Sequence, residues 1–174
     1  MIDYAILTAK VDAKAKDLGT HSAVVMKALD AFARVLLTRI RLGFKMGKDP
    51  DGNTWAPLNK KLTRTGQPLR NTGRMQASFT ARRDGDGVLV GSNLRIPGSS
   101  SSLPAVHQYG MTIEPTRGKY LVWAAPGGKG MIFAKSITIP ARRMMPLTAS
   151  GAVDLPLPWA QSALKAMANA MDLS

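Results

Sequence analysis

The stretch FKMGKDPDGNTWAPL, residues 44–58, determines where the chain turns back on the segment before it. Asp49-Pro50-Asp51-Gly52 lies at its centre and predicts a tight turn. The proline fixes φ, the aspartate side chains hydrogen-bond to nearby backbone, and the glycine accepts a positive φ. We therefore expect the turn to fold Trp55 back, as a buried aromatic residue, against the end of the preceding segment.

The segment before this turn has the apolar spacing of one long helix. Thr20 is a suitable N-cap, and the stretch from Gly43 to Gly47 provides an end. Most cations of the segment fall off the apolar stripe, as expected for a helix with one buried and one solvated face. The stripe consists of Val25, Leu29, Phe32, Leu36, Ile40 and Phe44.

The segment after the turn predicts a short helix and a β-hairpin. Asn71 or Thr72 is expected to cap a helix that ends near Ala77. Residues 78–83 and 88–92 have the composition of strands, and the DGDG sequence between them is a strong hairpin signal. The serine-rich residues 97–102 have almost nothing to bury and predict a flexible surface segment.

The second half of the chain predicts mostly strands. One helical turn is expected over residues 104–109, with Gly110 as its end. Strands are expected over residues 111–114, 119–125 and 131–140, the last two joined by a glycine-rich hairpin. The fold class is therefore α+β, with a long N-terminal helix packed on an antiparallel β-sheet.

The C-terminal part predicts a linker and an amphipathic helix that begins at Pro158. This helix either occupies a groove on a neighbouring molecule or covers its own domain. We expect an N-terminal arm or short helix over residues 1–19, an α+β domain over residues 20–147, and the linker and helix over residues 148–174.

The residues that usually perform chemistry are scarce. The chain has no cysteine, two histidines (His21 and His107) and one glutamate, Glu114. No zinc-ligand set, no G-x-S-x-G serine motif and no suggestive pair of acids is present, so we expect no enzyme, no metal and no cofactor. His107 is expected to be a structural histidine whose ring bonds a backbone carbonyl. The N-terminus has no signal-peptide core, and no apolar run is long enough to span a membrane.

The positive charge is concentrated in one third of the chain. The formal net charge is +13, and between Arg34 and Arg83 twelve cations face only Asp49 and Asp51, which leaves +10. Such a field attracts an acidic protein surface or nucleic acid, and it is also compatible with a solvated basic face that has no specific partner. The candidate contacts to a DNA channel or an acidic partner are Lys60, Lys61, Arg64, Arg82 and Arg83.

Four motifs in order carry a resemblance to a known family. Residues 44–58 are followed by LRNTGRM (69–75), VHQYG (106–110) and IPARR (139–143), and this succession resembles the phage virion morphogenesis family over roughly residues 20–147. The position after IPAR is often Pro in that family and is Arg143 here. The resemblance implies a structural virion protein that completes the tail and joins head to tail at the neck. A ring of six or twelve copies around the DNA channel would match the symmetry of phage tails and portals.

The same resemblance suggests partners and contact residues. The expected partners are the head–tail connector or adaptor and the tail terminator or tail tube proteins, with non-specific contact to genomic DNA, no membrane, and assembly in the host cytoplasm. An alternative is a basic DNA-binding accessory protein of packaging or assembly. The arginines and methionines after IPA favour an interface, or else a strand end that packs on its own core. The candidate interface residues are Trp55, Arg70, His107, Gln108, Tyr109, Arg142, Arg143, Met144 and Met145.

Overall fold

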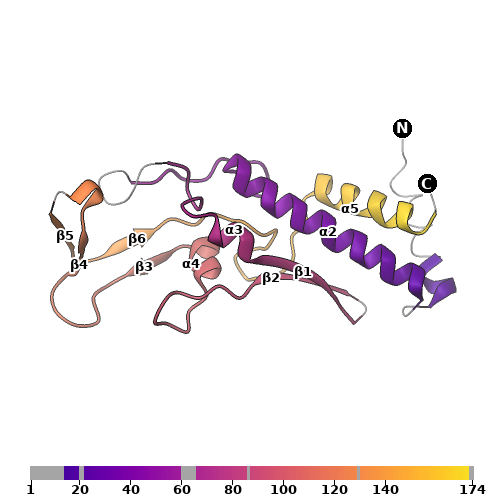
Figure 1. Ribbon diagram of the computed structural model, residues 1–174, viewed down its shortest axis with the longest axis horizontal. Helices are drawn as coiled ribbons and strands as arrows, with labels where there is room; N and C mark the ends of the chain where they lie inside the picture. Colours follow the sequence, from indigo (N-terminus) through magenta and orange to yellow (C-terminus); the bar gives the residue numbers. More distant parts are fainter. Residues whose placement is uncertain (1–13, 20–21, 60–65, 86, 129, 173–174) are drawn as a thin grey trace.

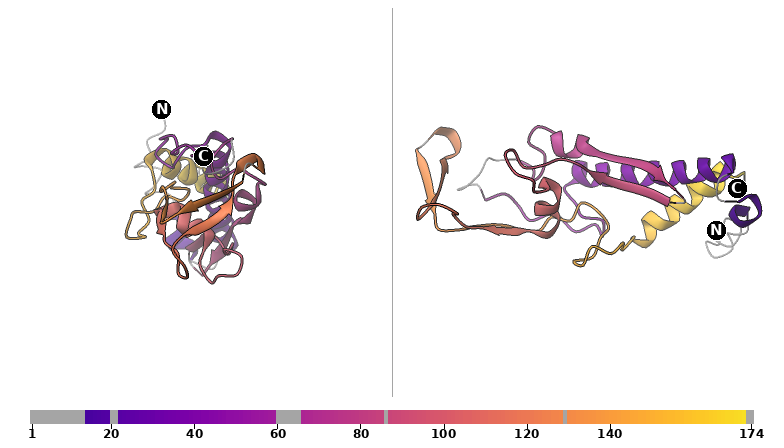
Figure 2. Two further views of the ribbon diagram at one scale, coloured as in Figure 1. Left: turned by 90° about the vertical axis from the view of Figure 1, so that its left-hand side faces the viewer. Right: turned by 90° about the horizontal axis from the view of Figure 1, so that it is seen from below.

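The structure is a computed structural model that describes residues 14–19, 22–59, 66–85, 87–128 and 130–172. Beyond a short helix at 14–18, the helices are α2 (Ala23–Met46), α3 (Arg74–Ser78), α4 (Leu103–Tyr109) and α5 (Leu157–Ala170), with a 3-10 turn η1 (Pro126–Gly128). The strands are β1 (Phe79–Asp84), β2 (Gly87–Ser92), β3 (Met111–Ile113), β4 (Leu121–Ala124), β5 (Met131–Ala134) and β6 (Ile137–Ile139). The molecule is elongated, with α2 and α5 at one end and the β4–β5 hairpin at the other (Figures 1 and 2).

The long helix predicted before the turn is α2, and both of its ends are capped. Ser22 is the N-cap, because its Oγ accepts a hydrogen bond from the Val25 N–H at 3.2 Å. The predicted cap, Thr20, lies outside the described residues and precedes the observed one. Gly47 ends the helix in the left-handed region, at φ 70°, a conformation that glycine adopts without steric cost.

The turn after α2 forms as predicted. The Gly52 N–H donates to the Asp49 carbonyl at 3.0 Å, and Asp49 Oδ1 accepts from the Asn53 N–H at 2.8 Å. The chain then returns to the helix end, where the Trp55 N–H donates to the Gly47 carbonyl at 2.9 Å. Trp55 is only 5% exposed, which confirms that the turn buries it.

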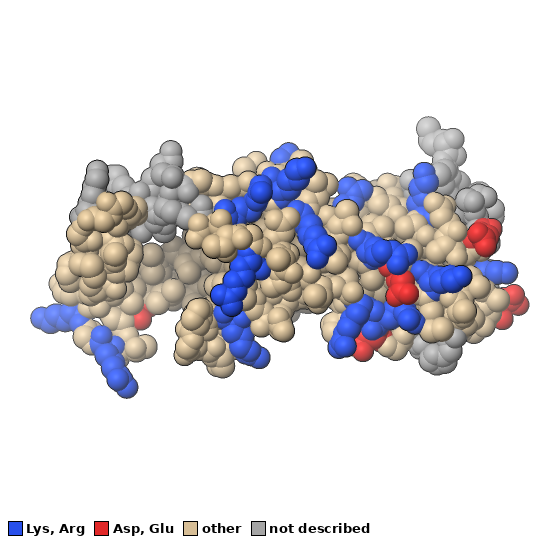
Figure 3. Space-filling model, in the orientation of Figure 1, with Lys and Arg blue, Asp and Glu red and all other residues tan. Residues whose placement is uncertain are grey.

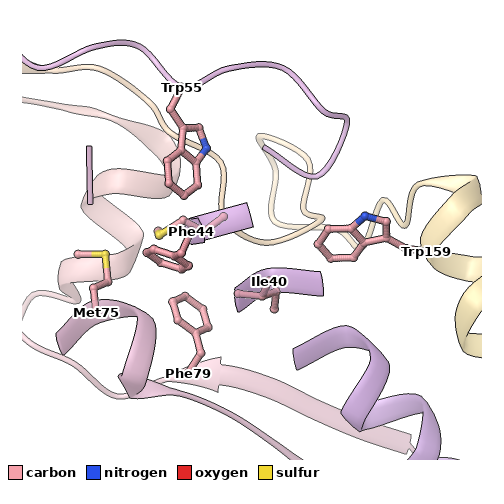
Figure 4. Close-up of a cluster of buried hydrophobic side chains, with 7 residues drawn as sticks. Ile40, Phe44, Trp55, Met75, Phe79 and Trp159 are labelled. Atoms are coloured by element: carbon pink, nitrogen blue, oxygen red, sulfur yellow. The ribbon is translucent and has the colours of Figure 1, made fainter. Parts of the chain in front are cut away.

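The main core is built around Phe44, which the turn and the following hairpin enclose (Figure 4). Its ring meets Trp55 edge-on, with centroids 5.4 Å apart, and Phe79 at a tilt, with centroids 5.6 Å apart. Such aromatic pairs stabilise beyond the area they bury. The buried residues of this core are Ile40, Phe44, Trp55, Met75, Phe79, Met144 and Trp159.

The predicted hairpin and short helices are present, with one different cap. β1 and β2 pair antiparallel from Phe79↔Ser92 to Asp84↔Gly87 and lie against α2. Gly73, at φ 75°, is the N-cap of α3, so the expected caps Asn71 and Thr72 were wrong. The serine-rich segment ends at Ser102, which caps α4 through the Ala105 N–H at 3.3 Å.

The sheet prediction was wrong in one respect. The six strands form three separate two-stranded antiparallel sheets, β1–β2, β3–β6 and β4–β5, within the described residues. The strand predicted over residues 131–140 is divided into β5 and β6, because its two halves pair with different strands. The α+β class is confirmed, and α2 packs on an antiparallel sheet, but that sheet is the two-stranded β1–β2 hairpin alone.

The C-terminal helix α5 packs along α2 and belongs to the same body (Figure 1). Trp159 joins the main core, while Ala168 and Met171 form a second cluster with Val25 and Ala28 of α2. Alanines on both helices allow a close approach of the two backbones. Of the two roles considered for this helix, the structure shows the one in which it covers its own chain, and the domain limits at residues 20 and 147 stay predictions.

Residues 111–139 form a long extension, which we call the β-arm (Figure 2). At its base β3 pairs with β6 from Met111↔Ile139 to Ile113↔Ile137, and at its tip β4 pairs with β5 from Leu121↔Ala134 to Ala124↔Met131. The Ala125 N–H donates to the Gly130 carbonyl at 2.8 Å and closes the predicted glycine-rich hairpin. We call the rest of the described chain the body. No described helix is long and apolar enough to cross a bilayer.

Candidate functional site

Three of the sequence motifs meet at one place in the body, although they lie far apart in the chain. Arg142 is 4% exposed, and its Nε and Nη2 donate to the carbonyls of Ala56 and Pro57 at 2.8 and 3.0 Å. Its backbone N–H donates to the His107 carbonyl at 2.6 Å. The Trp55 indole N–H donates to the Arg143 carbonyl at 2.8 Å. We call this meeting point the motif junction.

Gln108 completes the motif junction and is itself 2% exposed. Its Oε1 accepts from the N–H groups of Met144 and Met145 at 2.7 and 3.1 Å, and its Nε2 donates to the Met145 carbonyl at 3.0 Å. The amide thus pairs backbone groups that would otherwise be buried without partners. The VHQYG, IPARR and WAPL motifs are held in fixed register by these contacts.

His107 differs from its prediction. Its Nδ1 is buried and has no hydrogen-bond partner among the described residues, so the expected ring–carbonyl bond is not found at this atom. Burial, and then the nearby charge of Arg142, lowers the pKa of His107 below its ordinary value of 6.5. The ring is therefore neutral at pH 7. Burial also lowers the pKa of the Arg142 guanidinium, which still stays charged at neutral pH.

The candidate interface residues divide into buried and exposed groups. Trp55, Gln108, Arg142 and Met144 are buried and contact the protein's own chain. Arg70 and Tyr109 are exposed, and His107, Arg143 and Met145 are partly buried. A contact role for the exposed members stays a prediction.

Arg143 is partly exposed and has a different environment from Arg142. Its Nη1 lies 2.6 Å from Asp51 Oδ2 in the turn, and its Nη2 lies 3.9 Å from Asp154 Oδ2. The side chain is 31% exposed, and Asp51 and Asp154 are more exposed still. The two consecutive arginines therefore have different partners: Arg142 donates to backbone carbonyls, and Arg143 pairs with aspartates.

A hollow of about 390 Å³ lies beside the motif junction. Leucines and Met75 supply its apolar wall, and Arg74, Arg95 and Arg142 reach its margin. No group of acids and histidines that could hold a metal ion occurs among the described residues. The lining is mainly apolar and is suited to packing by an apolar side chain.

The basic region follows the long helix and the hairpin. Figure 3 shows Lys and Arg side chains scattered in a band across the middle of one face, with few acids between them. Arg82 and Arg83 are exposed on β1, and Arg83 Nε pairs with Asp30 Oδ1 at 2.8 Å. Lys60, Lys61 and Arg64 lie outside the described residues, so their predicted contacts stay predictions.

The β-arm carries exposed apolar side chains that the sequence analysis did not select. Val122 and Phe133 are directly opposite each other in the β4–β5 register and are 50% and 63% exposed. Tyr120 meets Phe133 edge-on with centroids 6.4 Å apart. The signal was present: LVWA and MIFA are apolar at every position, so a two-stranded ribbon cannot bury both faces.

Comparison with known proteins adds one positive finding. Neither the curated proteins nor the solved structures contain a match to this chain. The model of the phage virion morphogenesis family matches residues 7–155, and this span includes the four motifs and the whole motif junction. That family is one of structural virion proteins, which agrees with a scaffold of packing contacts at the junction. The chain therefore belongs to the phage virion morphogenesis family.

Proposed function

We propose that this chain completes the tail of a phage and joins head to tail at the neck, as one subunit of a ring around the DNA channel. The observation that carries the proposal is the family match over residues 7–155, which makes the chain a virion morphogenesis protein. The body supports a mechanical role, because its helices, turn and hairpin close on one aromatic core. Assembly needs such a rigid subunit and no bond-making step.

A ring is the arrangement that suits a neck. Heterologous contacts between identical subunits generate a ring when the rotation closes, and six or twelve copies match tails and portals. The expected neighbours are the connector or adaptor on the head side and the tail terminator or tail tube on the other. Exposed cations on the hairpin, among them Arg82, would suit a wall that faces either DNA or an acidic neighbour.

The decisive experiment is cryo-electron microscopy of phage particles with the gene intact and with it disrupted. Filled heads beside unattached tails, and a ring of density missing from the neck, are the expected result of disruption. Normal joined particles without the gene product would overturn the proposal. Counting subunits in the neck density of intact particles would give the copy number.

A second candidate is a DNA-binding accessory protein of packaging or assembly. The formal net charge of +10 between Arg34 and Arg83 favours it. Binding that depends on phosphate neutralisation weakens steeply with salt. Fluorescence anisotropy of a labelled duplex at increasing salt measures this directly. A steep salt slope that Arg82→Glu reduces would support the second candidate, and indifference to DNA would favour the neck.

A further inference from the structure

The β-arm concentrates exposed apolar side chains within a short stretch of the chain. Five of the eleven large hydrophobic side chains exposed in the described structure lie between residues 111 and 139. They are Met111, Tyr120, Val122, Met131 and Phe133, with exposed fractions from 45% to 63%. Met111 lies at the base of the arm and the other four lie in or beside the β4–β5 pair, and exposed apolar side chains that gather in one place mark an interaction site.

Strand register places four of these side chains on one face. In an antiparallel pair, opposite residues share a face, so Val122 lies beside Phe133 and Met131 lies beside Ala124. Tyr120 is two residues before Val122 and contacts Phe133, which extends the same face. We call Tyr120, Val122, Met131 and Phe133 the tip face.

The ribbon cannot supply a core for this face by itself. A two-stranded hairpin is marginally stable alone, and β4–β5 forms a sheet of only those two strands. The views agree that the tip lies far from α2 and α5 (Figures 1 and 2). The tip face is therefore available to another molecule.

The charges around the tip face indicate what that molecule is. Residues 111–139 contain four cations and one acid, Glu114. Arg117, Lys119 and Lys135 are all exposed on the arm. In Figure 3 the visible side of the arm is largely uncharged, with cations along its lower margin. A partner of complementary charge has an apolar patch with acidic residues at its rim.

A second copy of this chain fits that description poorly. The chain has 24 Lys and Arg against 11 Asp and Glu, and two of its aspartates, Asp30 and Asp51, already pair with Arg83 and Arg143. Nucleic acid fits less well, because Val122 and Met131 are aliphatic and the rings of Tyr120 and Phe133 meet edge-on, so they do not present a row of parallel faces for stacked bases. Both remain outcomes that an experiment can detect.

We propose that the tip face, with Arg117, Lys119 and Lys135 around it, docks on an acid-rimmed apolar patch of a different virion protein. This inference rests on the proposed function, since it assumes that the chain assembles into a particle. The body would form the ring, and the arm would reach across to the neighbouring component. The tip face would become buried only at that step.

The test uses the full chain and particles from phage in which the gene is disrupted. Purified unattached tails and purified filled heads are each mixed with the protein and sedimented at increasing salt. Wild type is expected to bind one of the two particles, and Met131→Ser with Phe133→Ser is expected to bind it roughly tenfold more weakly or worse, as for residues at the centre of an interface. The matched control, Met46→Ser with Leu89→Ser, changes two side chains of similar exposure on the body.

The cations of the β-arm are tested with a second pair of variants. Arg117→Glu with Lys119→Glu is expected to weaken binding several-fold at low salt and to reduce its salt dependence. Lys27→Glu with Lys165→Glu makes the same charge change on exposed positions of α2 and α5 and serves as the control. If the arm variant and the control variant bind equally well, the partner has no acidic rim that contacts the arm, and that part of the proposal fails.

Three results would overturn the inference. The first is unchanged particle binding by the Met131→Ser and Phe133→Ser variant. The second is self-association of the wild type in sedimentation that this variant abolishes, which would make a second copy the partner. The third is loss of duplex or single-strand DNA binding in this variant alone.

Phage production separates this inference from the proposed function. If disruption of the gene leaves joined particles, the proposed function fails. If disruption separates heads from tails but the tip-face variant still yields normal joined particles, only the inference about the arm fails. Circular dichroism and thermal unfolding of each variant confirm that the body is still folded.

Discussion

In the body Phe44 and Phe79 are fully buried, whereas in the β-arm Phe133 is 63% exposed. Phenylalanine therefore has a different role in each region. In the body it closes a core between a helix, a turn and a hairpin, and the side chains of Gln108 and Arg142 pair backbone groups beside that core. In the arm it lies on a ribbon with no covering layer. The difference shows that the body buries its own aromatic rings, whereas the arm leaves its apolar side chains uncovered, as the docking proposal requires.

The strongest test of the comparison is removal of a core ring. Phe44→Ala is expected to lower the free energy of unfolding by about 3–5 kcal/mol, because it deletes a buried ring and leaves a cavity between Trp55 and Phe79. Urea unfolding followed by Trp fluorescence measures the change. A loss below about 1 kcal/mol would show that the body is not held by this core.

The next test separates the two arginines of the IPARR motif. Arg142→Met leaves the carbonyls of Ala56 and Pro57 without a donor and is expected to cost about 1–3 kcal/mol for each one. Arg143→Met removes a partly exposed ion pair with Asp51 and is expected to cost about 1 kcal/mol or less. Urea unfolding of both variants gives the two values.

The contrast between these arginines also corrects a sequence-based test. An interface role for both arginines, one of the two roles considered for IPARR, implies that replacing Arg142 and Arg143 together with Glu abolishes assembly and leaves the monomer folded. Because Arg142 is buried at the motif junction, that double change would unfold the body first. Arg143→Glu alone is the variant that tests an assembly role, and equal destabilisation by the two single Met variants would contradict this division.

Gly110 joins the body to the arm and offers a test of that connection. Its φ of 75° and ψ of 164° lie in a region that essentially only glycine occupies, and a Cβ there would sit 2.9 Å from the Ala141 nitrogen. Gly110→Ala is expected to cost about 1–3 kcal/mol, measured by urea unfolding. Gly91→Ala on β2, where a Cβ meets nothing within 4 Å, is the control and should change little.

The pH dependence of stability tests the buried ring of His107. Its pKa is lowered in the folded protein, so between the folded and the ordinary pKa the unfolded chain binds the extra proton. The neutral His107 ring makes its full contribution to the free energy of unfolding above pH 6.5. That contribution is lost as the pH falls below 6.5, and the free energy of unfolding changes by at most about 1.4 kcal/mol per pH unit.

The measurement is urea unfolding of wild type and His107→Gln at pH 7.5 and 5.5. The variant should lose less stability than wild type between the two pH values. His21→Gln removes the only other histidine of the chain. It is the control for the loss of one titrating histidine from the unfolded chain. An identical pH dependence in wild type and His107→Gln would contradict the lowered pKa.

What the sequence could predict was the part of the fold set by local patterns. The stripe from Val25 to Phe44 and the Asp-Pro-Asp-Gly turn depend on near neighbours, so α2 and the burial of Trp55 were predicted correctly. The DGDG hairpin is local as well, and β1–β2 confirms it. The family assignment was also confirmed, because four motifs in order are specific where each alone is weak.

What the sequence could not predict depends on distant partners. Nothing local distinguishes a strand of ten residues from β5 and β6, which divide because one pairs with β4 and the other with β3. The buried role of Arg142 depends on carbonyls more than eighty residues away. The predicted contact residues Lys60, Lys61 and Arg64 lie outside the described residues, so neither outcome applies to them.

The variant with the smallest expected effect on folding gives the most direct comparison between the body and the β-arm. Phe133→Ala makes the same chemical change as Phe44→Ala, but on a side chain that is already 63% exposed, so the free energy of unfolding should change by no more than about 0.5 kcal/mol. Urea unfolding of the two variants side by side measures the contrast. If Phe133→Ala destabilised the protein by as much as a core substitution, the tip face would be part of the folded core, and its exposure would not mark a docking surface. If it leaves folding unchanged and weakens binding to tails or heads, the apolar surface of the arm is maintained for assembly, since folding alone gives no reason to keep it.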